Sequence, residues 1–75
     1  MLYIVRSVRW AKSPKGNTSK YHYEGPNKAK AMRVYYEVHA ACAANVGVAS
    51  TVTMTEAPEG SPFRVHVLSQ DFYTE

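Results

Sequence analysis

The residues closest to catalytic chemistry are a histidine and the only cysteine of the chain. His39 and Cys42 stand three positions apart among good helix formers, so they would be neighbours on one helix. A thiol beside an imidazole can form a nucleophilic pair. The alanines around Cys42 disfavour a charged thiolate, however, and a lone cysteine in such a setting is typically a buried structural thiol. We therefore expect no catalytic residues and a protein that is not an enzyme.

Metal and cofactor chemistry is equally poorly supported by the sequence. His22, His39 and His66 belong to different predicted elements, whereas zinc needs three or four convergent ligands. The Lys- and Gly-containing loop at residues 14–17 lacks the spacing of a phosphate-binding loop. The sequence predicts neither a metal site nor a cofactor.

Binding chemistry is better represented, because positive charge and aromatic rings gather in the first half of the chain. Eight of the nine Lys and Arg residues lie within residues 1–33, opposed there only by Glu24. Such asymmetry attracts anionic partners, and basic groups interleaved with aromatics are typical of surfaces for single-stranded nucleic acid. The predicted partner- or anion-binding residues are Arg9, Trp10, Lys12, Lys15, Lys20, Tyr21 and Tyr23. The alternative is that these lysines are solvated charges and the tyrosines pack in strands.

The elements that must position these residues are four strands and one helix. Alternating, β-branched or aromatic stretches predict strands over residues 2–10, 20–24, 48–54 and 63–70. Helix formers predict a helix over about 27–46. We expect a single α+β domain, residues 1–75, with ββαββ order and the helix on one face of a four-stranded antiparallel sheet. A βαββ arrangement, with residues 20–24 merely extended, is the alternative.

The same periodicities predict which side chains face the core. The helix carries an apolar stripe at three- to four-residue spacing: Ala31, Val34, Tyr35, Val38, Ala41, Cys42 and Asn45 or Val46. The first strand has a mostly apolar side (Leu2, Ile4, Arg6, Val8 and Trp10) and a mixed side. In the last strand we expect Phe63, Val65 and Val67 inward, Arg64 and His66 outward, and a tail from residue 71 onward.

Residues 38–55 contain no Asp, Glu, Lys or Arg, which is unusual for a helix with a solvent-exposed side. Small uncharged residues allow a second backbone to approach closely. We expect the chain to self-associate as a homodimer, either through His39, Ala40 and Ala43 or through an edge strand. The alternative is an exposed helix rich in alanine because alanine favours helix.

The length of the chain and its lack of targeting signals limit the possible fold size and cellular location. Seventy-five residues allow one small core. A single cysteine excludes a disulfide framework and fits a reducing compartment. The apolar stretch at residues 1–8 is short and interrupted by Arg6, unlike a signal peptide, and no stretch is long enough to span a membrane. We expect a cytoplasmic protein that does not bind membranes.

The chain as a whole resembles small phage-encoded accessory proteins. The resemblance covers the N-terminal hairpin, the helix Lys28-Ala29-Lys30-Ala31-Met32-Arg33-Val34-Tyr35-Tyr36, Gly47-Val48 and Val52-Thr53-Met54. Such proteins include inhibitors of host enzymes and of bacterial defence systems, among them anti-CRISPR proteins. The resemblance implies an inhibitor or adaptor that binds a host protein or nucleoprotein complex in the bacterial cytoplasm. Direct binding of nucleic acid or a nucleotide signal by the basic half is the alternative.

Overall fold

The protein is described by a computed structural model that covers residues 1–10, 16–44 and 48–72. Its elements in chain order are β1 (Leu2–Arg9), β2 (Thr18–Gly25), α1 (Lys28–Ala44), β3 (Ser50–Ala57) and β4 (Val65–Phe72). The predicted ββαββ order is confirmed, and the βαββ alternative is wrong because β2 pairs with β1 along its whole length.

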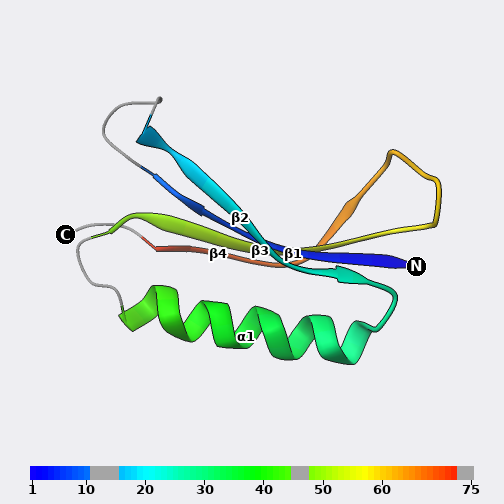
Figure 1. Cartoon of the computed structure of the whole chain (residues 1–75), viewed down its shortest axis with the longest axis horizontal. Helices are drawn as coiled ribbons and strands as arrows, with labels where there is room; N and C mark the ends of the chain where they lie inside the picture. The colour runs from blue at the N-terminus through cyan, green and yellow to red at the C-terminus, as the bar shows by residue number, and fades with distance from the viewer. Residues whose placement is uncertain (11–15, 45–47, 73–75) are drawn as a thin grey trace.

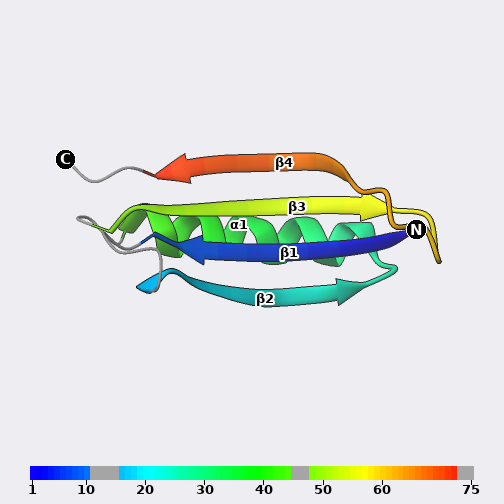
Figure 2. The same cartoon turned by 90° about the horizontal axis from the view of Figure 1, so that it is seen from above.

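All four strands form one antiparallel sheet in the order β2-β1-β3-β4 (Figure 2). The helix α1 lies along one face of this sheet, over the central strands, and no helix of the described residues lies on the other face (Figure 1). Within the described residues, no helix is both long and apolar enough to cross a membrane. The arrangement therefore has two layers, a helix and a sheet, with one sheet face left open.

The core lies between α1 and the two central strands. Its fully buried members include Val5 of β1 and Met54 of β3, which face each other in the register of the two strands. Tyr3 lies beside them, so the helix packs on the mixed side of β1 and not on the mostly apolar side. Arg6 interrupts that apolar side, and burying a guanidinium under the helix would cost more than the extra methyl groups would contribute.

The helix begins where its sequence provides a cap. The side-chain oxygen of Asn27 accepts a hydrogen bond from the backbone N–H of Lys30 at 3.0 Å, as an N-cap residue does. Ala31 and Tyr35, one turn apart, are buried against the sheet, and Val34 and Val38 flank them. The predicted stripe is thus confirmed at these four positions, while Asn45 and Val46 lie outside the described residues.

The last strand differs from its prediction in its length and in which of its side chains pack against the core. Phe63 and Val65 are 80% and 63% exposed, so the expectation that they pack in the core is wrong, although the register places Val65 on the helix side of the sheet. A register shift opposite Met54 and Thr55 inserts Val67 as an extra residue, which reverses the alternation beyond it. Leu68 and Phe72 consequently pack against the core, and Asp71 belongs to the strand and not to a tail.

Candidate functional site

The open face of the sheet carries a polar groove of about 300 Å³. Side chains from all four strand regions line it: Ile4, Arg6, Tyr21, Thr53, Thr55, Arg64 and His66. We call this set the open-face groove. It lies on the side of the sheet opposite α1, since α1 packs on the intervening residues Val5 and Met54.

The groove follows from strand alternation and register. On β1, Arg6 lies between Tyr21 of β2 and Thr53 of β3. Thr55, two residues along β3, lies between Ile4 of β1 and His66 of β4. Residues directly opposite in antiparallel strands share a face, so these two rows stand side by side across the sheet. Arg64 precedes β4 by one residue and completes the lining.

The groove has a closed floor and a rim of exposed side chains, of which two are arginines. Ile4 is only 7% exposed and forms the floor, while Arg6, Arg64 and His66 are exposed. Tyr21 is 60% exposed and presents its ring to solvent. Among the described residues no carboxylate lines the groove.

Besides Asp71, which pairs with Thr51 further along this face, one carboxylate lies near the groove, since Glu24 stands opposite Ile4 on β2. It is exposed and borders the groove without lining it. Two guanidinium groups, each able to bind a phosphate through two parallel hydrogen bonds, therefore dominate the local charge.

Trp10 stands at the far end of the same face. Its indole N–H donates to the hydroxyl of Thr51 at 2.8 Å, and that hydroxyl donates to a carboxylate oxygen of Asp71 at 2.7 Å. This chain of hydrogen bonds holds a half-exposed ring at the end of the sheet. Trp10 is four residues from Arg6 along the chain, which corresponds to about 13 Å in an extended strand.

The predicted binding residues are split between the two faces of the sheet. Tyr21 and Trp10 belong to the open face. Arg9 and Lys20 instead line a hollow with Ser7 and His22 on the helix side. Strand alternation explains this split, because Arg9 and Trp10, like Lys20 and Tyr21, are adjacent residues that point to opposite faces. The register shift in β2 adds a second separation, because the extra residue His22 places Tyr21 and Tyr23 on opposite faces.

The other predicted residues do not add to the open-face groove. Tyr23 packs against the core, and its hydroxyl accepts a hydrogen bond from the backbone N–H of Asn27. Lys12 and Lys15 lie outside the described residues. The sequence reasoning missed Arg6, Arg64 and His66 as site residues. Strand alternation did place Arg64 and His66 outward, but only the strand order brings them next to Arg6.

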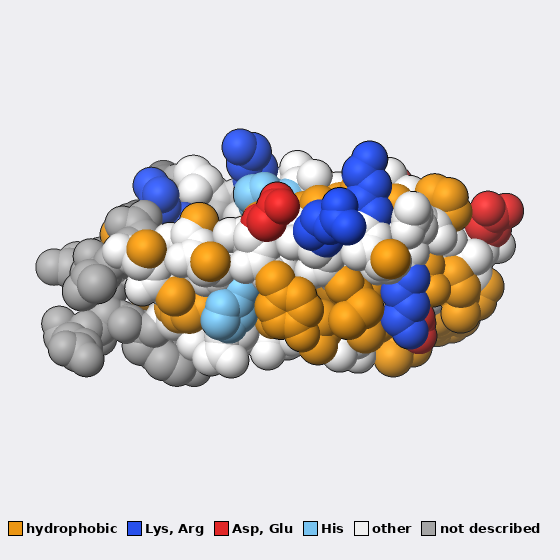
Figure 3. All heavy atoms as spheres, turned by 90° about the horizontal axis from the view of Figure 1, so that it is seen from below, with side chains coloured by type: hydrophobic (Ala, Val, Ile, Leu, Met, Phe, Trp, Pro, Cys, Tyr) orange, Lys and Arg blue, Asp and Glu red, His pale blue; other side chains and the backbone are white. Residues whose placement is uncertain are grey.

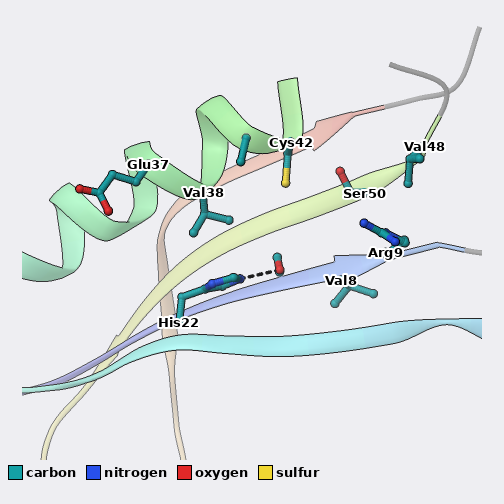
Figure 4. Close-up of a pocket in the computed structure, with 10 residues that line it drawn as sticks. Val8, Arg9, His22, Glu37, Val38, Cys42, Val48 and Ser50 are labelled. Atoms are coloured by element: carbon teal, nitrogen blue, oxygen red, sulfur yellow. Dashed lines mark hydrogen bonds between the residues drawn. The ribbon is translucent and has the colours of Figure 1, made fainter. Parts of the chain in front are cut away.

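A second hollow of about 350 Å³ lies between the C-terminal half of α1 and the sheet (Figure 4). Val38, Ala41 and Cys42 form its helix wall, and the Cys42 sulfur points into it. Across from them the Ser7 hydroxyl and Nε2 of His22 lie 2.7 Å apart. Burial, and secondarily the nearby charge of Lys20, lower the pKa of His22 from its ordinary value of 6.5.

This helix-side pocket holds a hydroxyl–imidazole pair, and none of the described residues that line it orients the pair. Glu37 lines the pocket but points away from His22 (Figure 4). His39 packs its ring on Phe72 at 5.0 Å between centroids and on Tyr35 at 6.0 Å, on the β4 side of the helix. His39 and Cys42 thus face different surroundings, and nucleophilic catalysis needs a positioned base.

Self-association was predicted through His39, Ala40 and Ala43. His39 lies on the β4 side of α1 and is half-buried, while Ala40 and Ala43 are exposed. Ala40 is five residues from the buried Tyr35, about 140° around the helix, so it points away from the sheet. No group of three His, Cys, Asp or Glu side chains able to hold a metal ion occurs in the described part of the chain.

No protein-family model matches the chain, and neither a curated protein nor a solved structure matches it. The functional argument therefore depends on the geometry and charge of the sites themselves.

Proposed function

We propose that this protein is a non-catalytic binding module whose open sheet face holds a phosphate-bearing single strand of nucleic acid. The observation that supports the proposal is the open-face groove, where Arg6 and Arg64 flank a row of hydroxyls with no carboxylate in the lining. Single strands bind surfaces of this kind through phosphate contacts to cations and stacking of bases on aromatic rings.

Each part of the groove has a role in this proposal. Arg6 and Arg64 bind phosphate oxygens from either side of β3, and the hydroxyls of Thr53 and Thr55 donate hydrogen bonds between them. The exposed ring of Tyr21 accepts a stacked base. Trp10 offers a second ring, and its distance from Arg6 along β1, about 13 Å, is a length that a few nucleotides can span. The formal net charge of +3 strengthens the approach of a polyanion.

Trp10 is the only tryptophan and provides a built-in probe of this face. A short oligothymidylate titrated at low salt should change Trp10 fluorescence in a saturable manner. Poly-glutamate of equal charge should have a much smaller effect, because it supplies anions but no bases to stack. Equal responses to both polymers would show that the face attracts charge without recognising nucleic acid. No response to either would remove the proposal.

A protein target is the second candidate, and exposed apolar side chains next to Arg64 in the chain favour it. Phe63 and Val65 precede and follow Arg64 and are 80% and 63% exposed, with Val65 on the helix side of the sheet. Aromatic and arginine side chains dominate the binding energy of protein interfaces. This candidate corresponds to the inhibitor or adaptor, of phage type, that the sequence resemblance implies. It would bind a host protein or nucleoprotein complex.

A pull-down from bacterial lysate with and without nuclease separates the two candidates. A partner lost after nuclease treatment supports nucleic acid, and a partner retained after treatment supports the protein target. Either activity would take place in the cytoplasm, where an unpaired Cys42 stays reduced.

A further inference from the structure

The edge of the sheet at β4 carries few of the features that usually prevent strand pairing, namely the extra residue Val67 and one carboxylate, Asp71, near its end. Within the described part of the chain, β4 pairs only with β3, so one row of its backbone N–H and C=O groups faces outward. Natural edge strands commonly carry charges or proline to block pairing with another chain. Residues 65–70 contain no proline, lysine, arginine or carboxylate, whereas β2 at the opposite edge contains Lys20 and Glu24.

The C-terminal half of α1 above this edge is uncharged, because residues 38–44 contain no Asp, Glu, Lys or Arg. A helix is about 10 Å across and neighbouring strands are about 4.8 Å apart, so one helix covers only about two strands. Because α1 lies over the central strands, it contacts β4 least of the four. The helix therefore covers β4 only in part, and Leu68 and Phe72 are half-buried.

Aromatic and small side chains form a strip along this side of α1 and β4. Tyr36 is 54% exposed and packs edge-on against Tyr35, and Phe72 of β4 meets His39. Ala43 continues the strip along the helix, where it is exposed. Figure 3 shows hydrophobic side chains in a band along this side of the helix, interrupted near one end by basic and acidic side chains, with more of the Lys and Arg side chains on the other side. We call Tyr36, His39, Ala43, Val65 and Phe72 the edge strip.

We infer that two copies of this chain associate by antiparallel pairing of β4 with β4 about a two-fold axis perpendicular to the sheet. The two four-stranded sheets then form one continuous sheet, with both helices on the same face. The trough above the paired β4 strands is walled by the two helices and filled by Tyr36 and Phe72 from both copies.

A second copy fits this surface for a specific reason. The outward backbone groups of β4 can form hydrogen bonds with the backbone of another strand. The edge strip can pack against apolar side chains that lie beside that strand on the same face. This chain offers both together in a self-complementary arrangement. The neutral edge also keeps like charges apart, even though each copy carries a net charge of +3. A polyanion has no cation to bind in the edge strip.

Sedimentation velocity over a range of protein concentrations tests the dimer directly. The wild-type protein should reach twice the mass of one chain at high micromolar concentration. Val65→Lys and Tyr36→Glu each change an exposed position, so both should fold, and each should weaken dimerisation about tenfold or more because the new charge loses its hydration in the apolar interface. Tyr21→Glu, at a comparably exposed tyrosine of the open face, is the matched control and should dimerise normally.

Amide hydrogen exchange identifies the pairing edge. Protection of β4 amides should increase with protein concentration, while protection of β2 amides should not. A monomer at every concentration would overturn the inference. So would a dimer that resists both charge substitutions, or one whose concentration-dependent protection lies at β2. None of these outcomes depends on nucleic-acid binding. The dimer can therefore be disproved without affecting the proposed function, and the proposed function can be disproved without affecting the dimer.

Discussion

The phenol of Tyr23 stands directly over the backbone of Gly25. A Cβ atom at position 25 would lie 2.7 Å from the Tyr23 hydroxyl and 3.0 Å from the ring carbon that bears it. The hydroxyl cannot move freely, because it accepts the backbone N–H of Asn27 at 3.1 Å just before the helix. Because position 25 is glycine, the Tyr23 side chain can lie over the end of β2 and bind the backbone just before α1.

Gly25→Ala should consequently destabilise the protein by about 1–3 kcal/mol, the usual range for overpacking. Tyr23→Phe alone should cost about 1 kcal/mol, because it removes the acceptor for the Asn27 N–H. The double variant should cost less than the sum, by about 1 kcal/mol, since the hydroxyl that clashes is gone. Urea unfolding of the four proteins measures this coupling, and strict additivity would contradict the described contact.

Asn27 should contribute measurably to stability as the cap of α1. Asn27→Ala removes the acceptor of the Lys30 N–H and should cost about 1 kcal/mol. Asn27→Asp retains a capping oxygen and should stay close to wild type. Thermal unfolding followed by circular dichroism compares the three proteins. Equal losses in both variants would mean that Asn27 acts through something other than its side-chain acceptor.

The core should not tolerate a smaller side chain at Met54. Its side chain is fully buried opposite Val5, so Met54→Ala should cost about 2–5 kcal/mol. A domain of this length is expected to have only about 4–11 kcal/mol of stability, so this variant should be partly unfolded on mild heating. Phe63→Ala, at a residue 80% exposed, is the control and should change stability by less than about 0.5 kcal/mol. Similar losses in both would contradict the described burial.

His22 should make stability depend on pH. Because burial lowers its pKa in the folded state, the unfolded chain binds the proton more readily. The contribution of neutral His22 is fully present above its ordinary pKa of 6.5 and is lost as pH falls below that value toward the folded pKa. The difference in unfolding free energy between wild type and His22→Gln should therefore shift against wild type as pH decreases from about 8 to about 5.

Chemical unfolding at several pH values gives this difference directly. His39→Gln is the comparison variant, since its ring packs on Phe72 and not beside Lys20. A wild-type advantage over His22→Gln that stays constant, or grows toward low pH, would mean that His22 is not kept neutral by its burial.

The element order could be predicted from sequence because local patterns encode it. Loops rich in Gly and Pro separate alternating stretches, and Asn27 opens a run of helix formers. The facing of β2 and β4 could not be predicted fully, because each strand contains a register shift set by its partner strand. One extra residue, His22 or Val67, changes which side chains reach each face.

The candidate site shows the same limit. Tyr21 and Trp10 were predicted as binding residues from local composition, and they do lie on the open face. Arg6 and Arg64 are 58 positions apart in the sequence (64 − 6), so only the pairing of β3 with both β1 and β4 brings them to one groove. Arg9 and Lys20 were grouped with Tyr21 by sequence proximity, but the sheet separates them.

Binding of a short oligothymidylate by the open-face groove, measured against salt concentration, tests the central proposal most directly. Wild type should bind with an affinity that falls steeply as salt rises, because phosphate contacts release counterions. Arg6→Ala and Arg64→Ala should each weaken binding and lower the salt slope by about 0.7, the value for one phosphate contact to a single strand. Arg33→Ala removes the same charge from the exposed side of α1 and should leave the slope unchanged. Equal effects of all three substitutions, or no salt-dependent binding by wild type, would contradict the proposal.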